Sequence, residues 1–300
     1  MAFKNAFKNL VAHFGTVWAI LLYMIIFAAL IIGLSLPFVL PIINAFSDAG
    51  VFEAFAGAFG ALFGDGGFSG LWDGLYKTYV LVADVLEYNG TVAELLKYFF
   101  IVIVIVAFRF FFGLHEIPLA TVIDGRMSCD ARYGLGGKFF STLSVSVRYS
   151  AAKLVIGMTF DFVMCMIIYG FGVWLGFGFI FVIAAMLTLS VFISFKNTML
   201  ACWAPCVVNG SGVIKGFGRS AAICFKRFGS IFSTYFVSLL LLMSIGLFVS
   251  LFTLGIGLII VLPFITVYYG YLNVTQYYNK TGRRYYINGV IFTPPTENVL

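Results

Sequence analysis

Six long apolar runs constrain this chain more than any other feature of its sequence. They lie at about 17–43, 97–122, 149–170, 174–200, 229–252 and 255–279. About 20 apolar residues in a helix cross the hydrocarbon core of a bilayer, and the backbone there must satisfy its own hydrogen bonds. Charged residues make up 10% of the 300-residue chain, against about 25% in soluble domains. We therefore expect an all-α integral membrane helical bundle, with six transmembrane helices in a single transmembrane domain over residues 1–300.

The charges are distributed unevenly between the connecting segments. The segment 46–96 contains one basic residue, Lys77, and seven acidic residues. The other polar stretches are basic and contain Lys4, Lys8, Arg126, Arg132, Lys138, Arg148, Lys215, Arg219, Lys226, Arg227, Lys280, Arg283 and Arg284. Lysine and arginine accumulate on the cytoplasmic side of membrane proteins. The pattern predicts cytoplasmic N- and C-termini and an extracytoplasmic insertion over 46–96.

Three segments of similar pattern precede pairs of apolar runs. They are 5–18, 140–153 and 219–232. Aligned without gaps, they place His13, Arg148 and Arg227 at the same position. In 213–228, apolar and basic residues recur on separate helical faces, which is typical of helices that lie at a membrane surface. The pattern predicts an internal repeat of three hairpin units, each with a basic amphipathic interfacial helix, one of them in a cytoplasmic segment over 201–228.

Six basic residues of these amphipathic segments are expected to face lipid headgroups. They are Lys4, Lys8, Lys215, Arg219, Lys226 and Arg227. At the N-terminus the expected apolar face consists of Phe3, Phe7, Leu10 and Phe14. Each lysine or arginine near an anionic leaflet contributes about 1 kcal/mol of binding free energy. A bilayer with anionic lipids is therefore the expected partner, and the helices either anchor the bundle or recognise a particular lipid or membrane-protein partner.

Two charges are expected deep in the bilayer. Arg109 lies about twelve residues beyond Lys97, or about 18 Å along a helix, and Asp161 lies about as deep when counted from Tyr149. An unpaired arginine at the bilayer centre costs at least ~2.5 kcal/mol. We expect Arg109 and Asp161 to form an intramembrane charge pair that faces the bundle interior. The pair either fixes helix packing or lines a polar path.

The insertion 46–96 is too apolar for a disordered linker. Phenylalanines recur at helical spacing at positions 52, 55, 59 and 63, and a second short helix is expected at about 78–88. The insertion is interpreted as a packing cap on the outer face or as a lid or partner surface. In the first transmembrane run, Pro37 and Pro41 are expected to kink or end the helix.

No motif predicts chemistry. The stretch "GLGGKFF" at 134–140 lacks the glycine and hydroxyl positions of a phosphate-binding loop, and "LHEIP" at 114–118 is not a zinc-protease motif. The cysteine spacing, which includes Cys202 and Cys206, is not that of a zinc ribbon. The basic residues form no separate domain that would bind nucleic acid. We therefore expect no catalytic residues, no metal, no cofactor and no nucleic-acid partner.

The C-terminal part, 211–279, carries a resemblance. "SGVIKGFGRSAAICFKRFGSIF", two apolar runs and "LPFITVYYGYLNVTQYY" follow one another. This arrangement resembles uncharacterised six-helix bacterial membrane proteins, including the membrane domain that precedes some glycerophosphodiester phosphodiesterases. The resemblance implies a bacterial cytoplasmic membrane and assigns no catalytic residue. The expected function is non-enzymatic organisation of lipids or protein partners; the alternative is a small-solute transporter or an accessory permease subunit.

Overall fold

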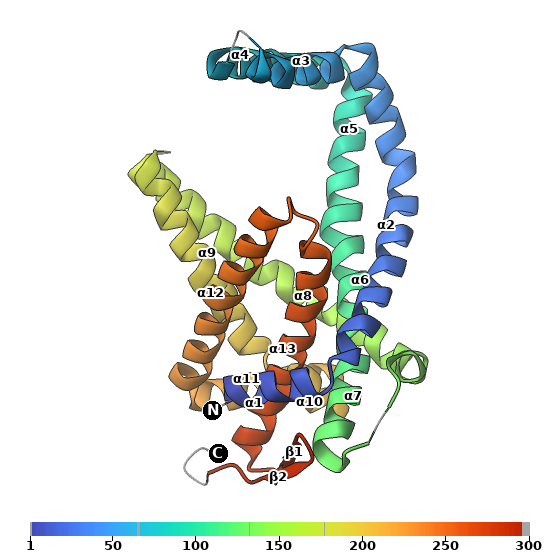
Figure 1. Ribbon diagram of the computed structural model, residues 1–300, viewed down its shortest axis with the longest axis vertical. Coiled ribbons are helices and arrows are strands. Elements are labelled where there is room, and N and C mark those ends of the chain that lie inside the picture. Colours follow the sequence, from blue (N-terminus) through green and yellow to red (C-terminus); the bar gives the residue numbers. More distant parts are fainter. Residues whose placement is uncertain (1, 65–66, 132, 177, 296–300) are drawn as a thin grey trace. The chain divides into compact units, whose positions relative to one another are not determined.

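The computed structural model describes residues 2–64, 67–131, 133–176 and 178–295, so Asp65 and Arg132 lie outside the described residues. The described chain is helical except for one small hairpin of strands (Figure 1). The elements are α1 (Ala2–Ala12), α2 (Gly15–Asp48), α3 (Val51–Phe63), α4 (Gly67–Tyr88), α5 (Gly90–Tyr98), η1 (Phe99–Ala107), α6 (Phe108–Leu114), α7 (Glu116–Cys129), α8 (Leu135–Leu175), α9 (Phe179–Leu200), α10 (Trp203–Val208), α11 (Val213–Lys226), α12 (Phe228–Phe252), α13 (Leu258–Thr281), β1 (Tyr285–Ile287) and β2 (Val290–Phe292). The all-α class is confirmed.

Six helical segments are long and apolar enough to cross a membrane. They are Gly15–Asp48, Gly90–Cys129, Leu135–Leu175, Ile180–Val208, Phe228–Phe252 and Leu258–Thr281. Several of these helical segments are longer than the apolar runs from which they were predicted. The 41 residues of α8 make a helix about 60 Å long, which is twice the roughly 30 Å thickness of the hydrocarbon core. The chain is therefore a multi-pass membrane protein, and α8 is longer than one perpendicular crossing of the bilayer requires.

The prediction that Pro37 or Pro41 could end the first transmembrane helix is wrong. Both prolines lie inside α2, which continues to Asp48. Each proline lacks an N–H and removes one hydrogen bond from the helix. Membrane helices tolerate the loss of one hydrogen bond at a proline. Ending the helix within the hydrocarbon would leave more backbone N–H and C=O groups unpaired than the proline does.

The chain divides into two compact units, residues 26–109 and residues 1–25 with 110–300. In the first of these, α3 packs along α4 through small residues. A Cβ atom on Gly74 would lie 2.5 Å from that of Ala58, and one on Gly70 would lie 3.1 Å from that of Ala61. Small residues spaced four apart let two helices approach closely. The expected short helix at 78–88 is in fact the C-terminal half of the 22-residue α4.

The segment before Arg109 is a wider, π-type helix over Phe99–Ala107. It contains six consecutive β-branched residues, from Ile101 to Val106. Such residues favour strands in water, but a lone strand in hydrocarbon would leave its backbone groups unpaired. The membrane therefore enforces a helix here, although the local residue preferences favour a strand.

The phenylalanines expected at helical spacing in the insertion lie on α3. The side chains of Phe52, Phe55 and Phe59 are exposed, and that of Phe63 lies outside the described residues.

In the larger unit, α13 forms the centre of the core. Its second half is almost wholly buried and includes Tyr268, Tyr271 and Tyr277. It packs against α1, α7, α10 and α12, and α8 and α9 pack beside α7 and α12. Gly270 lets α13 approach α7 closely, because a Cβ atom at this position would lie 2.9 Å from the Leu119 side chain.

The three predicted repeat segments differ in structure. The chain breaks its helix after α1 near His13 and after α11 at Arg227, whereas α8 runs through Arg148 without a break. The two outer segments therefore share a short helix, a break and a helix that is long and apolar enough to cross a membrane. The internal repeat stays a prediction.

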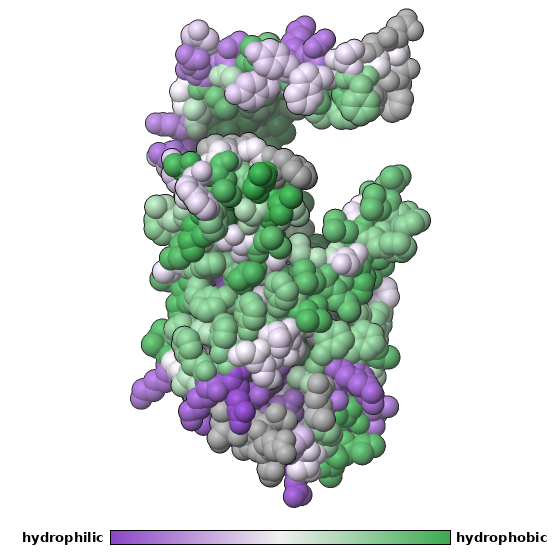
Figure 2. All heavy atoms as spheres, turned by 90° about the vertical axis from the view of Figure 1, so that its left-hand side faces the viewer, coloured by the Kyte–Doolittle hydropathy of each residue, from purple (hydrophilic) through white to green (hydrophobic). Residues whose placement is uncertain are grey.

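The amphipathic helices present their basic residues outward. Lys4, Lys8, Lys215, Arg219, Lys226 and Arg227 are all exposed. Figure 2 shows, in its lower half, a broad hydrophobic surface with hydrophilic side chains gathered along its lower border. On α1, Asn5 and Asn9 are buried together with Leu10, while Phe7 and Phe14 of the expected lipid-facing side are exposed.

The predicted orientation is tested by labelling single cysteines with a membrane-impermeant thiol reagent. Ser69 and Thr293 are both exposed and are replaced by cysteine in a background in which the exposed Cys129 and Cys165 are changed to serine. Because the basic segments are expected in the cytoplasm, Ser69→Cys should be labelled in intact cells and Thr293→Cys only after lysis. The opposite pattern would invert the orientation.

Candidate functional site

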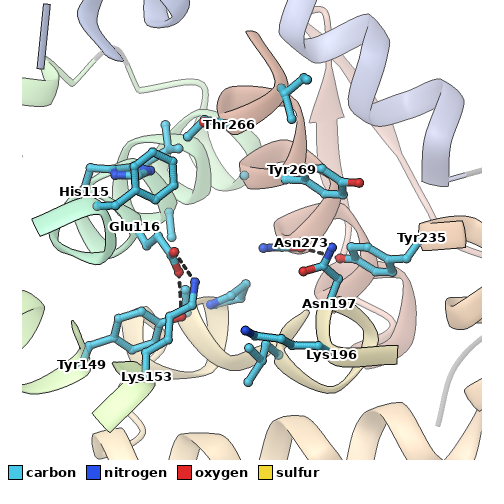
Figure 3. A pocket seen from close by; sticks show the side chains of 18 of the residues that line it. His115, Glu116, Tyr149, Lys153, Lys196, Asn197, Tyr235, Thr266, Tyr269 and Asn273 are labelled. Atoms are coloured by element: carbon cyan, nitrogen blue, oxygen red, sulfur yellow. Dashed lines mark hydrogen bonds and ion pairs between the residues drawn. The ribbon is translucent and has the colours of Figure 1, made fainter. Parts of the chain in front are cut away.

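A cavity of about 400 Å³ lies inside the larger unit, between α7, α8, α9, α12 and α13 (Figure 3). Its walls combine apolar side chains with an unusual density of polar ones for a membrane bundle. The polar lining residues are His115, Glu116, Tyr149, Lys153, Lys196, Asn197, Tyr235, Thr266, Tyr269 and Asn273. This size is within the range of small-molecule sites, which are typically about 300–1,000 Å³.

The first wall is built at a break between α6 and α7. In a continuous helix the ring of Pro118 would clash with the carbonyl group four residues earlier, and α7 instead begins at Glu116. The Glu116 carboxylate forms an ion pair with Lys153, and it accepts a hydrogen bond from the Tyr149 hydroxyl at 3.0 Å. Tyr149 and Lys153 are four residues apart and so lie on the same face of α8. Figure 3 shows these three side chains meeting on one side of the cavity.

The second charge pair lies further along the same face of α8. The Lys196 ammonium of α9 lies 2.7 Å from Asp161 Oδ1. To reach it, the Lys196 side chain passes over Gly157, where a Cβ atom would lie 3.6 Å from the lysine Nζ. Lys153, Gly157 and Asp161 are spaced four residues apart, so they form one stripe along α8. Lys153 lines the cavity from this stripe, and Lys196 lines it from α9.

The opposite wall comes from α12 and α13 (Figure 3). The Tyr235 hydroxyl donates a hydrogen bond to the Asn273 side-chain oxygen, and the Tyr235 ring stacks on that of Tyr269 with centroids 6.0 Å apart. Two buried atoms of the lining, Tyr269 Oη and His115 Nδ1, have no hydrogen-bond partner among the described residues. Buried polar groups are normally satisfied by protein, water or a ligand. Both atoms are fully buried, so they do not open onto the hollow itself.

The lining favours an occupant that accepts hydrogen bonds. Lys153 and Lys196 each carry three N–H donors, and the described residues show one acceptor for each of them. Asn197 and Asn273 add amide donors on the other side. Two lysines and one carboxylate lie in the lining itself, and Asp161 beside it is the partner of the second lysine. Carboxylate and phosphate groups match such a donor set.

The predicted site residues have different outcomes. Asp161 lies beside the cavity and pairs with Lys196, which was not among the predicted residues. Arg109 belongs to the 26–109 unit, so its pairing with Asp161 stays a prediction. Glu116, Lys153 and Lys196 were missed, although a count of charges in the apolar helices would have pointed to them. No three metal-binding side chains gather among the described residues.

Comparisons with models of protein families, with curated proteins and with solved structures give no match for this chain. The fold and the spans define a multi-pass, helical integral membrane protein. The resemblance of residues 211–279 to six-helix bacterial membrane proteins stays a prediction.

The partner of Asp161 can be identified by two double-mutant cycles. Asp161→Ala leaves Lys196 uncompensated and should lower the free energy of unfolding in detergent by roughly 1–3 kcal/mol, below the ~3–5 kcal/mol of a fully buried pair, because about a quarter of each side chain is exposed. Adding Lys196→Ala should recover part of this loss. Thermal unfolding measures both effects.

Arg109→Ala provides the matched second cycle. If Arg109 also interacts with Asp161, the Arg109→Ala/Asp161→Ala double variant recovers stability as well. Strict additivity in the Lys196 cycle would contradict the energetic importance of the observed pair.

Proposed function

We propose that this chain is a non-enzymatic membrane protein that binds a small anionic solute in the cavity between α7, α8, α9, α12 and α13. It would act as a solute transporter or as the accessory subunit of a permease. The observation that carries this proposal is the pair of lysine ammonium groups, from Lys153 and Lys196, that line one cavity and keep N–H donors in excess of their described acceptors.

The energetics support a binding role over a purely structural one. Ionisable residues inside a membrane bundle are costly, and they commonly mark the path or site of a substrate. The two charge pairs join α8 to α7 and to α9, and the lysines of both pairs also line the hollow. An anion placed between the two ammonium groups would use donors that the protein itself leaves available.

The binding proposal is tested with the purified protein in detergent. Thermal unfolding is followed with phosphate, sulfate, succinate or chloride at equal ionic strength. We expect a polyatomic anion to raise the melting temperature, because a ligand that binds only the folded state stabilises it. The Asp161→Asn/Lys196→Met double variant removes one ammonium group together with its carboxylate partner, and it should weaken binding about tenfold or more, since a charged hydrogen bond contributes roughly 1.5–3 kcal/mol.

Lys138→Met is the matched control. Lys138 lies outside the cavity, with its ammonium group 4.0 Å from the centre of the Tyr133 ring, so its loss should leave the anion response unchanged. A melting temperature that is insensitive to all the polyatomic anions would contradict the proposal. An unchanged response in the Asp161→Asn/Lys196→Met variant would contradict it equally.

A second function is favoured by the surface of α11. Its basic residues Lys215, Arg219 and Lys226 are exposed, and they lie beside the large exposed side chains of Ile214 and Phe225. Helices that combine exposed basic and apolar side chains bind at the membrane interface and prefer anionic lipids. We propose that α11 organises anionic lipids or a membrane-protein partner at the cytoplasmic surface of a bacterial cytoplasmic membrane, with both chain termini on that side.

A peptide covering residues 209–230 tests this second function. It should become helical on anionic vesicles and much less so on neutral ones, as measured by circular dichroism. Added salt should weaken the binding, because the attraction is screened over about 10 Å at 0.1 M ionic strength. The matched control replaces Lys215, Arg219 and Lys226 by glutamine and should lose the preference for anionic vesicles. Equal binding to both kinds of vesicle by the natural peptide would rule out an electrostatic role.

A further inference from the structure

A second, larger hollow lies between α1 and the β1–β2 hairpin. It has a volume of about 820 Å³, and it is lined on the α1 side by Lys4, Phe7, Lys8 and Val11. On the hairpin side the lining includes Ile287, Asn288, Val290, Ile291 and Phe292. We call this hollow the α1–hairpin groove. It lies wholly in the larger unit and shares no lining residue with the cavity beside α8.

Three hydrogen bonds between distant parts of the chain hold the groove together. Asn5 Nδ2 donates to the Tyr285 hydroxyl at 2.9 Å, and Asn9 Nδ2 donates to the carbonyl oxygen of Tyr286 at 3.3 Å. The Asn9 side-chain oxygen accepts from the Asn288 N–H at 3.3 Å. Burial raises the pKa of Tyr285 to about 12, so its hydroxyl stays protonated and donates to Asn279. The two walls are thus fixed by buried asparagine side chains on one face of α1.

The surface of the groove combines cationic and apolar chemistry. Lys4 and Lys8 are exposed and lie one helical turn apart, so their ammonium groups can approach the same anionic group. Beside them Phe7, Val11 and Ile291 are 45%, 56% and 57% exposed. Two cations next to uncovered apolar side chains match a molecule that has both an anionic headgroup and a hydrocarbon chain.

The position of the groove in the chain also favours a lipid. Two residues separate the end of α1 at Ala12 from the start of the transmembrane helix α2 at Gly15. The groove is therefore within reach of the bilayer surface, where anionic phospholipids are the most abundant amphiphiles of this kind. An acidic peptide would satisfy the lysines, but it would not need the adjoining apolar surface.

We propose that the α1–hairpin groove binds an anionic phospholipid. Its phosphodiester group accepts hydrogen bonds from Lys4 and Lys8, and one acyl chain covers Phe7, Val11 and Ile291. The inference deepens the second proposed function by adding a defined lipid site, and it is independent of the solute cavity. A lipid held here would fasten the N-terminal helix and the C-terminal hairpin to the membrane together.

The affinity test uses the purified full-length protein in detergent. It is titrated with phosphatidylglycerol or with phosphatidylcholine, and bound lipid is counted by native mass spectrometry. We expect tighter binding of phosphatidylglycerol. Lys4→Gln/Lys8→Gln should raise its Kd about tenfold or more, because each basic residue contributes about 1 kcal/mol. The matched control, Lys77→Gln/Lys97→Gln, removes the same charge from exposed positions of α4 and α5 and should change the Kd less than about twofold.

The location test does not depend on the charge variants folding. The photoreactive residue p-benzoylphenylalanine replaces Phe7 in the groove or, as a control, the exposed Tyr88 of α4. In membranes that contain phosphatidylglycerol, the adduct at position 7 should be this lipid and should form in higher yield than at position 88. Equal lipid yields at both positions, or equal loss of affinity in the two charge variants, would overturn the proposal. A peptide or protein adduct at position 7 would overturn the lipid proposal and would indicate that the groove is a docking surface for a protein. The vesicle-binding test of the 209–230 peptide reports on the second proposed function independently of this result.

Discussion

A charged side chain inside a membrane bundle persists only beside a partner of opposite charge, and this requirement organises the larger unit around α8. One stripe of that helix carries Lys153, Gly157 and Asp161. Glu116 of α7 pairs with the first of them and Lys196 of α9 with the last, and glycine between them leaves room for the Lys196 side chain. These two ion pairs hold three helices together, and they also place both ammonium groups beside a hollow. The same residues therefore determine how the helices pack and what the hollow could bind.

Much of the fold follows from the sequence because the bilayer allows few structures. The six β-branched residues from Ile101 to Val106 resemble a strand locally, yet the membrane requires a helix there, and a helix is present. The ends of the helices were harder to predict. Pro37 and Pro41 interrupt hydrogen bonds without ending α2, and α8 begins well before its apolar run. These boundaries depend on contacts and on the membrane surface, which local patterns do not encode.

The candidate site was only partly predictable. Counting depth along the helices identified Asp161 as a deep charge, whereas Lys153 and Lys196 lie near the ends of the predicted runs 149–170 and 174–200, where lysine usually reaches water. The helix α8 begins well before its apolar run, and α10 follows α9 directly, so these lysines remain inside the bundle. The buried face of α1 was missed for a different reason. Its key residues, Asn5 and Asn9, are polar, and an apolar periodicity cannot reveal a face whose contacts are hydrogen bonds.

The bonds from Asn5 and Asn9 to the hairpin also bear on the order in which the protein is assembled. Their sequence separations are between 277 and 280 residues, so α1 leaves the ribosome long before the partners of its asparagines are made. Until residues 285–288 emerge, the two asparagines face lipid headgroups or water in place of their final partners. Closure of the hairpin onto α1 therefore follows the synthesis of all six apolar helices that lie between them.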